Sequence, residues 1–426
     1  MLRYLLVLLL SQAVLGSIPS KYLRDDLTDI EDEILEGLDD YDEEAEREKQ
    51  EIVDERVRKI YDKVRSNGYP MEVHSVETQD GYILGVHRIP YSPSNGPAAN
   101  KPVVFLQHGL LCSSNDWVIL GPGKGIAYLL SDLGYDVWMG NARGNSFSKN
   151  HKKLNPKKGD FWEFSWHEIG YYDLPAMIDY VLAKTGQSSL NYVGHSQGTT
   201  SFFIMTSLRP EYNSKIRAMH ALAPVAFMSN MPNPFFSALS PFVQKENILK
   251  KLIGSFEFLP SSKMFSLAGQ TLCTDQSIVQ GVCSSILFLI AGFDQENMNA
   301  TLLPEILDVT PAGASINQLI HYAQSYTSGK FRQYDWGVTK NLIKYTSLSP
   351  PDYPLNKITA PVNLYYANND WLAAVKDVQI LASKLPNLVY NKMVPFHKFN
   401  HLDFLWAINV YELVYADLIA NIQKYT

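Results

Sequence analysis

One serine lies in the pattern Gly-His-Ser-Gln-Gly at positions 194–198. The apolar run 190–193 precedes it, and the helix-compatible run TTSFFIMTSL follows. A serine in a sharp turn from strand to helix holds its hydroxyl above a sheet, and the flanking glycines let the backbone turn without a clash. The N-terminus of the next helix would add partial positive charge near a developing oxyanion. A chance turn is the alternative, but the surrounding run types favour Ser196 as a nucleophile.

An oxyanion formed at such a serine needs two N–H donors. The amide of Gln197, directly after the serine, is one candidate. The second should come from a loop after an earlier strand, and VVFLQHGLL places Leu110 after the apolar run that begins at Val103. We therefore expect the Leu110 and Gln197 amides to form the oxyanion hole. His108 in the same loop is interpreted as a structural histidine.

An acid that orients the base should follow the serine along the chain. The apolar run VNLYYA ends at Asn368-Asn369-Asp370, which places a carboxylate at a strand end. Asp377 is the rival, but it lies beyond the strand end in an expected helix. Asp370 is therefore the predicted acid.

The base is expected near the C-terminus, where LVYNKMV leads into PFHKFNHLDF. This loop offers His397 and His401. His401 stands at a loop-to-helix junction before LDFLWAI, and the order Ser, Asp, His favours it as the base. Asp403 is interpreted as an acid in the first turn of that helix.

The elements that must position these residues are predicted from apolar runs. Residues 71–89 form two alternating halves around Asp80-Gly81, which is a hairpin signal. Short apolar runs typical of buried parallel strands occur at 103–107, 135–139, 190–193, 219–222, 362–367 and 388–394. A helix over 173–184, with Pro175 in its first turn and Gly186 after its end, is one of several that separate them. The expected fold class is α/β, a mostly parallel sheet with helices on both faces.

The strand pattern stops between about 226 and 344, where clusters such as NPFFSALSPFV indicate a mainly helical insertion. It resumes at Val362. We therefore divide the chain into five predicted parts: a signal peptide 1–16, an acidic segment 17–58, the first part of the core 59–225, a cap or lid insertion 226–344 and the second part of the core 345–426.

The first 16 residues carry Arg3 and an apolar run from Tyr4 to Leu10, followed by small residues typical of signal-peptide cleavage. A membrane anchor is the alternative, but the run is shorter than the roughly 20 residues that span a bilayer. Residues 25–55 then hold 17 acidic and two basic residues, in a chain of formal net charge −7. We expect a solvated, disordered stretch there, and a removable pro-segment over a basic body is the alternative.

An oxidising compartment makes the three cysteines informative. Cys273 and Cys283 are separated by nine residues and can close a short loop, which leaves Cys112 as the odd thiol. The sequon Asn299-Ala300-Thr301 is an expected N-glycosylation site.

Several long motifs carry a resemblance to a known family: GNARGNSFSKNH, FWEFSWHEIGYYDLPAMIDY, VGHSQGTT, YDWG, NND and NHLDF. From about Tyr61 to the C-terminus, the chain resembles the acid lipases, the animal gastric and lysosomal lipases. The resemblance implies an α/β-hydrolase fold with an inserted cap, and hydrolysis of triacylglycerols or cholesteryl esters without a cofactor or metal. By position, it implies a role for the following residues: Ser196, Asp370 and His401 as the triad, Leu110 and Gln197 as oxyanion residues, and Cys273 with Cys283 as a disulfide.

This chain also departs from the family pattern. The loop PFHKFNH is longer than usual, Ala291 replaces a third cysteine, and Cys112 and the acidic segment are extra. The expected protein is a secreted or lysosomal serine lipase that acts on neutral lipid at a lipid–water interface, with no nucleic-acid partner and no transmembrane segment. A catalytically silent lipid-binding or yolk-type protein on the same fold is the alternative. No zinc-ligand spacing or phosphate-binding glycine loop is present. The oligomeric state stays open.

Overall fold

The computed structural model describes residues 55, 57–240, 256–259, 291–292, 294 and 296–426. Residues 56–426 group as one compact unit. The strands are β1 (Glu72–Glu77), β2 (Tyr82–Ile89), β3 (Val103–Gln107), β4 (Asp136–Gly140), β5 (Asn150–His151), β6 (Leu190–His195), β7 (Ile216–Leu222), β8 (Glu257–Phe258), β9 (Ala314–Ser315), β10 (Val362–Tyr366) and β11 (Leu388–Met393). The main helices are α4 (Ile126–Asp132), α5 (Trp166–Glu168), α6 (Leu174–Thr185), α7 (Gln197–Leu208), α8 (Pro234–Leu239), α12 (Leu303–Val309), α13 (Ile316–Ser328), α14 (Val338–Tyr345), α15 (Val375–Lys384), α16 (Asp403–Trp406) and α17 (Ala416–Gln423).

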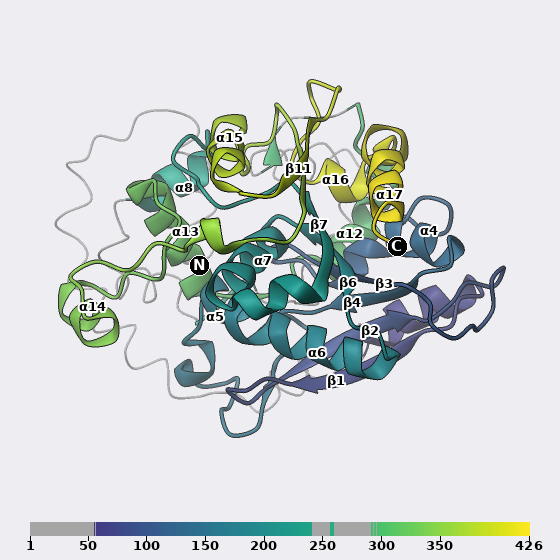
Figure 1. The fold of residues 1–426 in the computed structure, drawn as a ribbon, viewed down its shortest axis with the longest axis horizontal. Helices are drawn as coiled ribbons and strands as arrows, with labels where there is room; N and C mark the ends of the chain where they lie inside the picture. The colour runs from purple at the N-terminus through teal and green to yellow at the C-terminus, as the bar shows by residue number, and fades with distance from the viewer. Residues whose placement is uncertain (1–54, 56, 241–255, 260–290, 293, 295) are drawn as a thin grey trace. The chain divides into compact units, whose positions relative to one another are not determined.

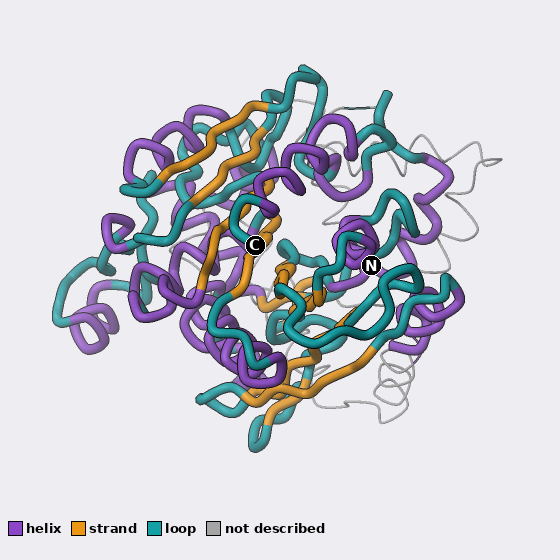
Figure 2. Tube along the Cα trace, turned by 45° about the vertical axis from the view of Figure 1, so that its right-hand side comes forward, coloured by secondary structure: helices purple, strands orange, loops and turns teal. Residues whose placement is uncertain are grey.

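One large sheet organises the unit, in the order β1-β2-β4-β3-β6-β7-β10-β11. The first two pairings along this order are antiparallel, and every pairing from β4 to β11 is parallel. The predicted hairpin is confirmed, with Glu72 opposite Arg88 and Gly81 at a φ of +97° in the turn. Helices lie on both faces of the sheet (Figures 1 and 2), as the alternation of runs predicted.

The central strands are buried along their whole length, which explains their unbroken apolar runs. In β3, β4 and β6 every residue is buried, as expected for a parallel sheet covered on both faces. All six predicted parallel strands are present. The expectation of complete burial is wrong for β11, where half-buried and exposed positions alternate because the strand lies at the edge of the sheet.

Local signals also explain where helices begin and end. Helix α6 has Pro175 in its first turn, where the missing N–H costs nothing, and ends at Gly186 with a φ of +70°. Between β7 and β10, the described residues form α8, α12, α13 and α14 and the short β8-β9 ladder. The regular structure of the described residues there is therefore mainly helical, while the predicted domain boundaries stay predictions.

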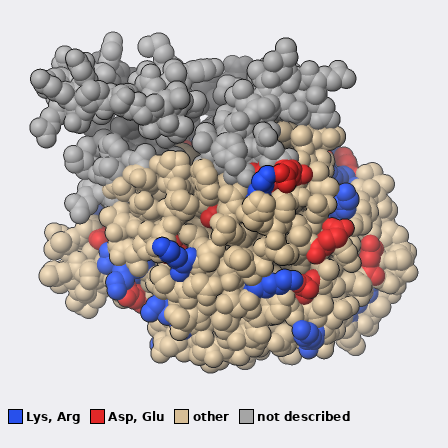
Figure 3. Space-filling model, turned by 90° about the horizontal axis from the view of Figure 1, so that it is seen from above, with Lys and Arg blue, Asp and Glu red and all other residues tan. Residues whose placement is uncertain are grey.

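The surface of the described part carries charges of both signs. On the face drawn in Figure 3, basic and acidic side chains are interspersed. No helix among the described residues is long and apolar enough to cross a membrane.

Candidate active site

The predicted nucleophile lies in the sharp turn between β6 and α7. Ser196 has φ 52° and ψ −117°, a conformation that costs an L-residue on the order of 1–3 kcal/mol. The turn is held because the Ser196 N–H donates to the Leu222 carbonyl of β7, and the Ser196 carbonyl accepts from Thr199. The side chain is 8% exposed. The strain is therefore held by hydrogen bonds to the neighbouring strand and to the first turn of the helix.

Close backbone contacts explain the glycines around this turn. A Cβ at Gly198 would lie 2.2 Å from the Gln107 carbonyl oxygen, and a Cβ at Gly194 would lie 2.9 Å from the Gly198 carbonyl carbon. Any larger residue would push α7 away from β3 and β6. Gly109 belongs to the same contact, since its Cβ would lie 3.0 Å from the Ser196 Cβ. The loop after β3 therefore lies directly against the serine.

Asp370 and His401 meet at the carboxyl ends of β10 and β11. His401 Nδ1 lies 2.9 and 2.8 Å from the two Asp370 carboxylate oxygens, and both side chains are buried. Asp370 Oδ1 also accepts the Leu372 and Ala373 N–H groups, which fixes the carboxylate. Such a pair places a proton on Nδ1 and leaves Nε2 available as a base.

The rival residues lie elsewhere. Asp377, in α15, accepts hydrogen bonds from the Asn230 backbone N–H at 2.9 Å and side-chain amide at 2.7 Å. His397 is exposed. Asp403 begins α16, as interpreted from the sequence, and its side chain accepts the Asn400 N–H.

Two backbone contacts hold His401 from behind. The Ala291 carbonyl accepts N–H groups from both Trp371 and His401, each at 3.3 Å, and so links the segments that carry Asp370 and His401. His195 Nε2 donates to the His401 carbonyl at 2.9 Å. Burial lowers the pKa of His195 well below its ordinary value. His195 is therefore a neutral donor that positions His401.

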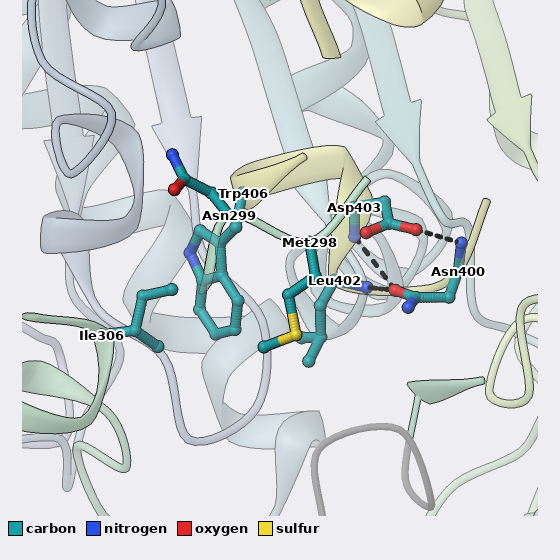
Figure 4. Close-up of a pocket in the computed structure, with 7 residues that line it drawn as sticks. All are labelled: Met298, Asn299, Ile306, Asn400, Leu402, Asp403 and Trp406. Atoms are coloured by element: carbon teal, nitrogen blue, oxygen red, sulfur yellow. Dashed lines mark hydrogen bonds between the residues drawn. The ribbon is translucent and has the colours of Figure 1, made fainter. Parts of the chain in front are cut away.

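Asn400 organises the loop in front of α16 (Figure 4). Its Oδ1 accepts the Leu402 and Asp403 N–H groups at 2.8 and 3.1 Å, and its amide donates to the Gly292 carbonyl at 3.0 Å. Burial, together with the neighbouring carboxyl of Asp294, raises the pKa of Asp403 to about 8. The loop that carries His401 is thus fixed by two features. One is the Asn400 side-chain amide with its three hydrogen bonds, here called an amide hub, and the other is the buried pair of acids Asp403 and Asp294.

The expected oxyanion residues adjoin the serine. Gln197 is the first residue of α7, where an N–H has no partner within the helix, and its side chain donates to Gln318 Oε1 of α13 at 2.8 Å. Leu110 follows Gly109 in the loop packed on Ser196. His108 is hydrogen-bonded as a structural histidine. Its Nδ1 lies 2.7 Å from the Gly109 carbonyl, and its Nε2 accepts from Ala142 and Asn145.

Sequence reasoning missed several of these supporting residues. His195 was inside the recognised motif, yet no role followed from its position. Gln318, the Ala291 carbonyl and Asp294 lie far along the chain from their partners, so no local spacing indicates the contacts. Arg143 had a signal in the GNARGNS motif. It is buried and pairs with Asp80 and Asp173, which fixes the loop after β4.

The remaining predicted residues have different outcomes. Cys273 and Cys283 lie outside the described residues, so their pairing stays a prediction. Cys112 is buried and in no disulfide within the described part, and burial raises the pKa of its thiol. Asn299 is half-buried, with Thr301 exposed beside it. Among the described residues, no group of three His, Cys, Asp or Glu could hold a metal ion.

A strained serine turn, an adjacent loop for oxyanion donors and a buried Asp–His pair, all at the carboxyl edge of a parallel sheet, define the α/β-hydrolase class. Residues 102–407 match the family model described as "alpha/beta hydrolase fold", and residues 60–121 match a "partial alpha/beta-hydrolase lipase region". A putative lipase from Sulfolobus solfataricus shares the fold, with a TM-score of 0.55 at 13% identity over 84% of this chain and 94% of that chain.

Relatives with named functions show which family within the α/β-hydrolase class the chain belongs to. The chain is 50% identical to Lipase 3 of Drosophila melanogaster over 85% of this chain and 92% of that protein. It is 41% identical to human gastric triacylglycerol lipase over 84% of this chain and 89% of that protein, and 41% identical to mouse lipase member K, with 84% and 89% covered. The chain belongs to the acid lipase family.

Proposed function

We propose that this protein is a lipase that hydrolyses carboxylic esters of neutral lipids through an acyl-enzyme on Ser196. The observation that carries the proposal is the contact of His401 Nδ1 with both Asp370 carboxylate oxygens, joined to the strained serine turn through His195, which donates to the His401 carbonyl. Lipid as the substrate class is supported by the names of the relatives, which are lipases. Triacylglycerols and cholesteryl esters are the proposed substrates.

In the proposed reaction, Ser196 Oγ attacks the ester carbonyl carbon while His401 Nε2 takes the hydroxyl proton. The Leu110 and Gln197 amides donate to the oxyanion. The carbon–oxygen bond to the alcohol then breaks, and His401 returns the proton to the leaving oxygen. Water, deprotonated by His401, attacks the acyl-enzyme and releases the fatty acid and the free serine. Asp370 holds the imidazole and stabilises its charged form.

We also propose a secretory route that ends outside the cell or in the lysosome. The support is the signal-like composition of residues 1–16, the cysteine spacing and the half-buried sequon at Asn299, whose Thr301 is exposed. If the route is used, glycosidase treatment should lower the apparent mass of the secreted protein, and Asn299→Gln should abolish that shift. A mature protein that keeps residues 1–16 would contradict this route.

The test of catalysis is Ser196→Ala assayed on triolein, cholesteryl oleate and a short-chain soluble ester. Loss of a triad nucleophile costs about 10⁶ in turnover. Ser201→Ala is the matched control, because Ser201 lies one turn further along α7 and its buried hydroxyl has no hydrogen-bond partner among the described residues. It should keep near-full activity. A wild-type protein that binds these lipids without cleaving them would instead establish the catalytically silent alternative.

A further inference from the structure

The segment 337–350, here called the α14 lobe, exposes an unusual share of apolar surface. Helix α14 lies at the edge of the ribbon drawn in Figure 1. The exposed fractions are 63% for Val338, 53% for Leu342, 77% for Ile343 and 64% for Leu348. These four are the most exposed large apolar side chains among the described residues. Clustered exposure of this kind marks an interaction surface, whereas single exposed apolar residues do not.

Helix α14 buries a polar residue and leaves its apolar ones exposed. Asn341 is the only buried residue of α14. Its amide donates to Asp335 Oδ1 at 2.7 Å and to the Leu348 carbonyl at 3.1 Å, and its Oδ1 accepts the Trp336 N–H at 2.9 Å. An amphipathic helix of a globular protein normally turns its apolar face to the core. Here the inward position belongs to an amide, so the apolar residues face outward.

Further contacts fix this orientation. The Tyr345 hydroxyl donates to the Tyr334 carbonyl at 2.9 Å, and Lys344 Nζ lies 4.1 Å from the centre of the Trp336 ring. The helix ends at Thr346 with a φ of 54°. The exposed face is therefore held by bonds from the Asn341 and Tyr345 side chains to the chain before the helix, and it does not result from a loose terminus.

The charge of the lobe has one sign. It contains Lys340 and Lys344, both exposed, and no acidic residue. The nearest carboxylate before it, Asp335, already accepts the Gly337 N–H at 3.0 Å and the Asn341 amide. Lysines beside an exposed apolar face can extend their charges to an anionic surface while their stems stay in apolar contact.

We propose that the α14 lobe docks this protein on a lipid–water interface that carries anionic amphiphiles. Leu342, Ile343 and their apolar neighbours would enter the acyl region, and the two lysines would pair with surface charges. A protein partner is disfavoured, because a stable interface needs roughly 800 Å² on each side, more than one eight-residue helix offers. The inference rests on the proposed function, since a lipase that acts on emulsified lipid releases anionic fatty acids at the surface it occupies.

The experiment measures co-sedimentation of the full chain with phosphatidylcholine vesicles, with and without phosphatidylglycerol. All proteins carry Ser196→Ala so that no lipid is cleaved. Leu342→Ser with Ile343→Ser should lower binding at least tenfold on both vesicle types, because two exposed apolar chains lose their insertion free energy. Lys340→Gln, which leaves the Lys344–Trp336 contact in place, should lower binding to the anionic vesicles alone, by about fivefold at low salt, and the loss should vanish at high salt.

The matched control is Val73→Ser with Leu133→Ser, two apolar residues each 47% exposed outside the lobe, which should bind like the parent protein. If the lobe variants also bind like the parent, the inference is wrong. The same substitutions are also made in the protein that keeps Ser196. These variants are assayed with a soluble short-chain ester, and their hydrolysis rate should equal that of the wild type. An inactive wild-type protein would overturn the proposed function instead, whatever the vesicles show.

Discussion

Two buried asparagines perform the same structural task in two different regions. Asn400, in front of α16, joins two backbone N–H groups and the Gly292 carbonyl. Asn341, in α14, joins the Trp336 N–H, Asp335 and the Leu348 carbonyl. Around Asn400 the apolar neighbours Phe399 and Phe404 are completely buried, whereas around Asn341 the apolar neighbours are exposed.

The comparison teaches that an amide hub can fix a segment independently of where its apolar residues point. Near His401, the hydrogen bonds of Asn400 act together with the packing of buried apolar side chains. Both fix the position of the loop that carries His401. In the α14 lobe, the hydrogen bonds of Asn341 fix the helix without apolar packing against the core. The apolar side chains of the lobe therefore stay exposed and can contact a lipid surface. Because a buried amide must keep its partners, each hub selects one local geometry.

The largest expected effect separates the two histidines of the catalytic loop. His401→Ala should reduce turnover on a soluble ester by at least ~10⁴, because the base and its Asp370 contact are lost together. His397→Ala should keep most of the activity, since that side chain is exposed. Steady-state kinetics with both variants decides, and the reverse ranking would move the base to position 397.

The next largest effect is expected from removing the Asn400 side chain, the amide hub near His401. Asn400→Ala leaves the part-buried N–H group of Leu402 and the buried N–H group of Asp403 without their acceptor, at a cost on the order of 2–4 kcal/mol in unfolding free energy. Turnover should fall about 10²-fold because His401 loses its placement. Urea denaturation and kinetics measure both. Asn409→Ala, which removes one half-exposed bond to Asn297, is the control and should change little. Equal losses in the two variants would contradict the special role of Asn400.

A pH effect should follow from the acids behind that hub. The folded state raises the pKa of Asp403 from 3.8 to about 8, so it keeps a proton that the unfolded chain releases. The stability from this proton is complete below about pH 4 and is lost as the pH rises toward about 8. Melting temperatures across this range should decline less steeply in Asp403→Asn than in the wild type. The exposed-pair variant Asp417→Asn should keep the wild-type slope. A parallel decline in Asp403→Asn would contradict the assignment.

The smallest effect is expected from removing the side chain of Asn341, the amide hub of the α14 lobe. Asn341→Ala should lower the melting temperature by about 1–2 °C, as expected for a loss on the order of 1 kcal/mol in a chain of this size. Hydrolysis of a soluble ester should stay the same, and vesicle binding should weaken about twofold as the helix loosens. Thr339→Ala, on the exposed side of α14, serves as the control. A large loss of soluble-ester activity would show that the two hubs are coupled.

Most of the sheet was predictable because burial on both faces forces unbroken apolar runs. The runs at β3, β6 and β10 located strands to within about two residues. The β11 run was predicted as a buried strand like the others, although it contains Lys392, and the strand order shows that it lies at an edge. Composition reports that a residue prefers burial, and topology decides how much of it is covered.

The candidate triad was predictable for a related reason. Chain order and strand ends limit which acid and histidine can meet at the carboxyl edge of the sheet, and the structure brings Asp370 and His401 together there. The contact of Ala291 with His401 joins residues about 110 positions apart, and nothing near Ala291 in the sequence points to it. The α14 lobe was missed because its pattern is that of an ordinary amphipathic helix, and only the bonds of Asn341 show that it is turned outward.

The strained backbone at Ser196 has a consequence for the history of such proteins. A glycine at φ 52° and ψ −117° would carry little of the steric penalty that a serine does, so a mutation that ends catalysis can also make the fold more stable. Selection for activity must therefore act continuously against a thermodynamic gain. Gene copies released from that selection can drift into non-enzymatic carriers on the same scaffold without a folding cost, which makes inactive relatives an expected by-product of this catalytic turn.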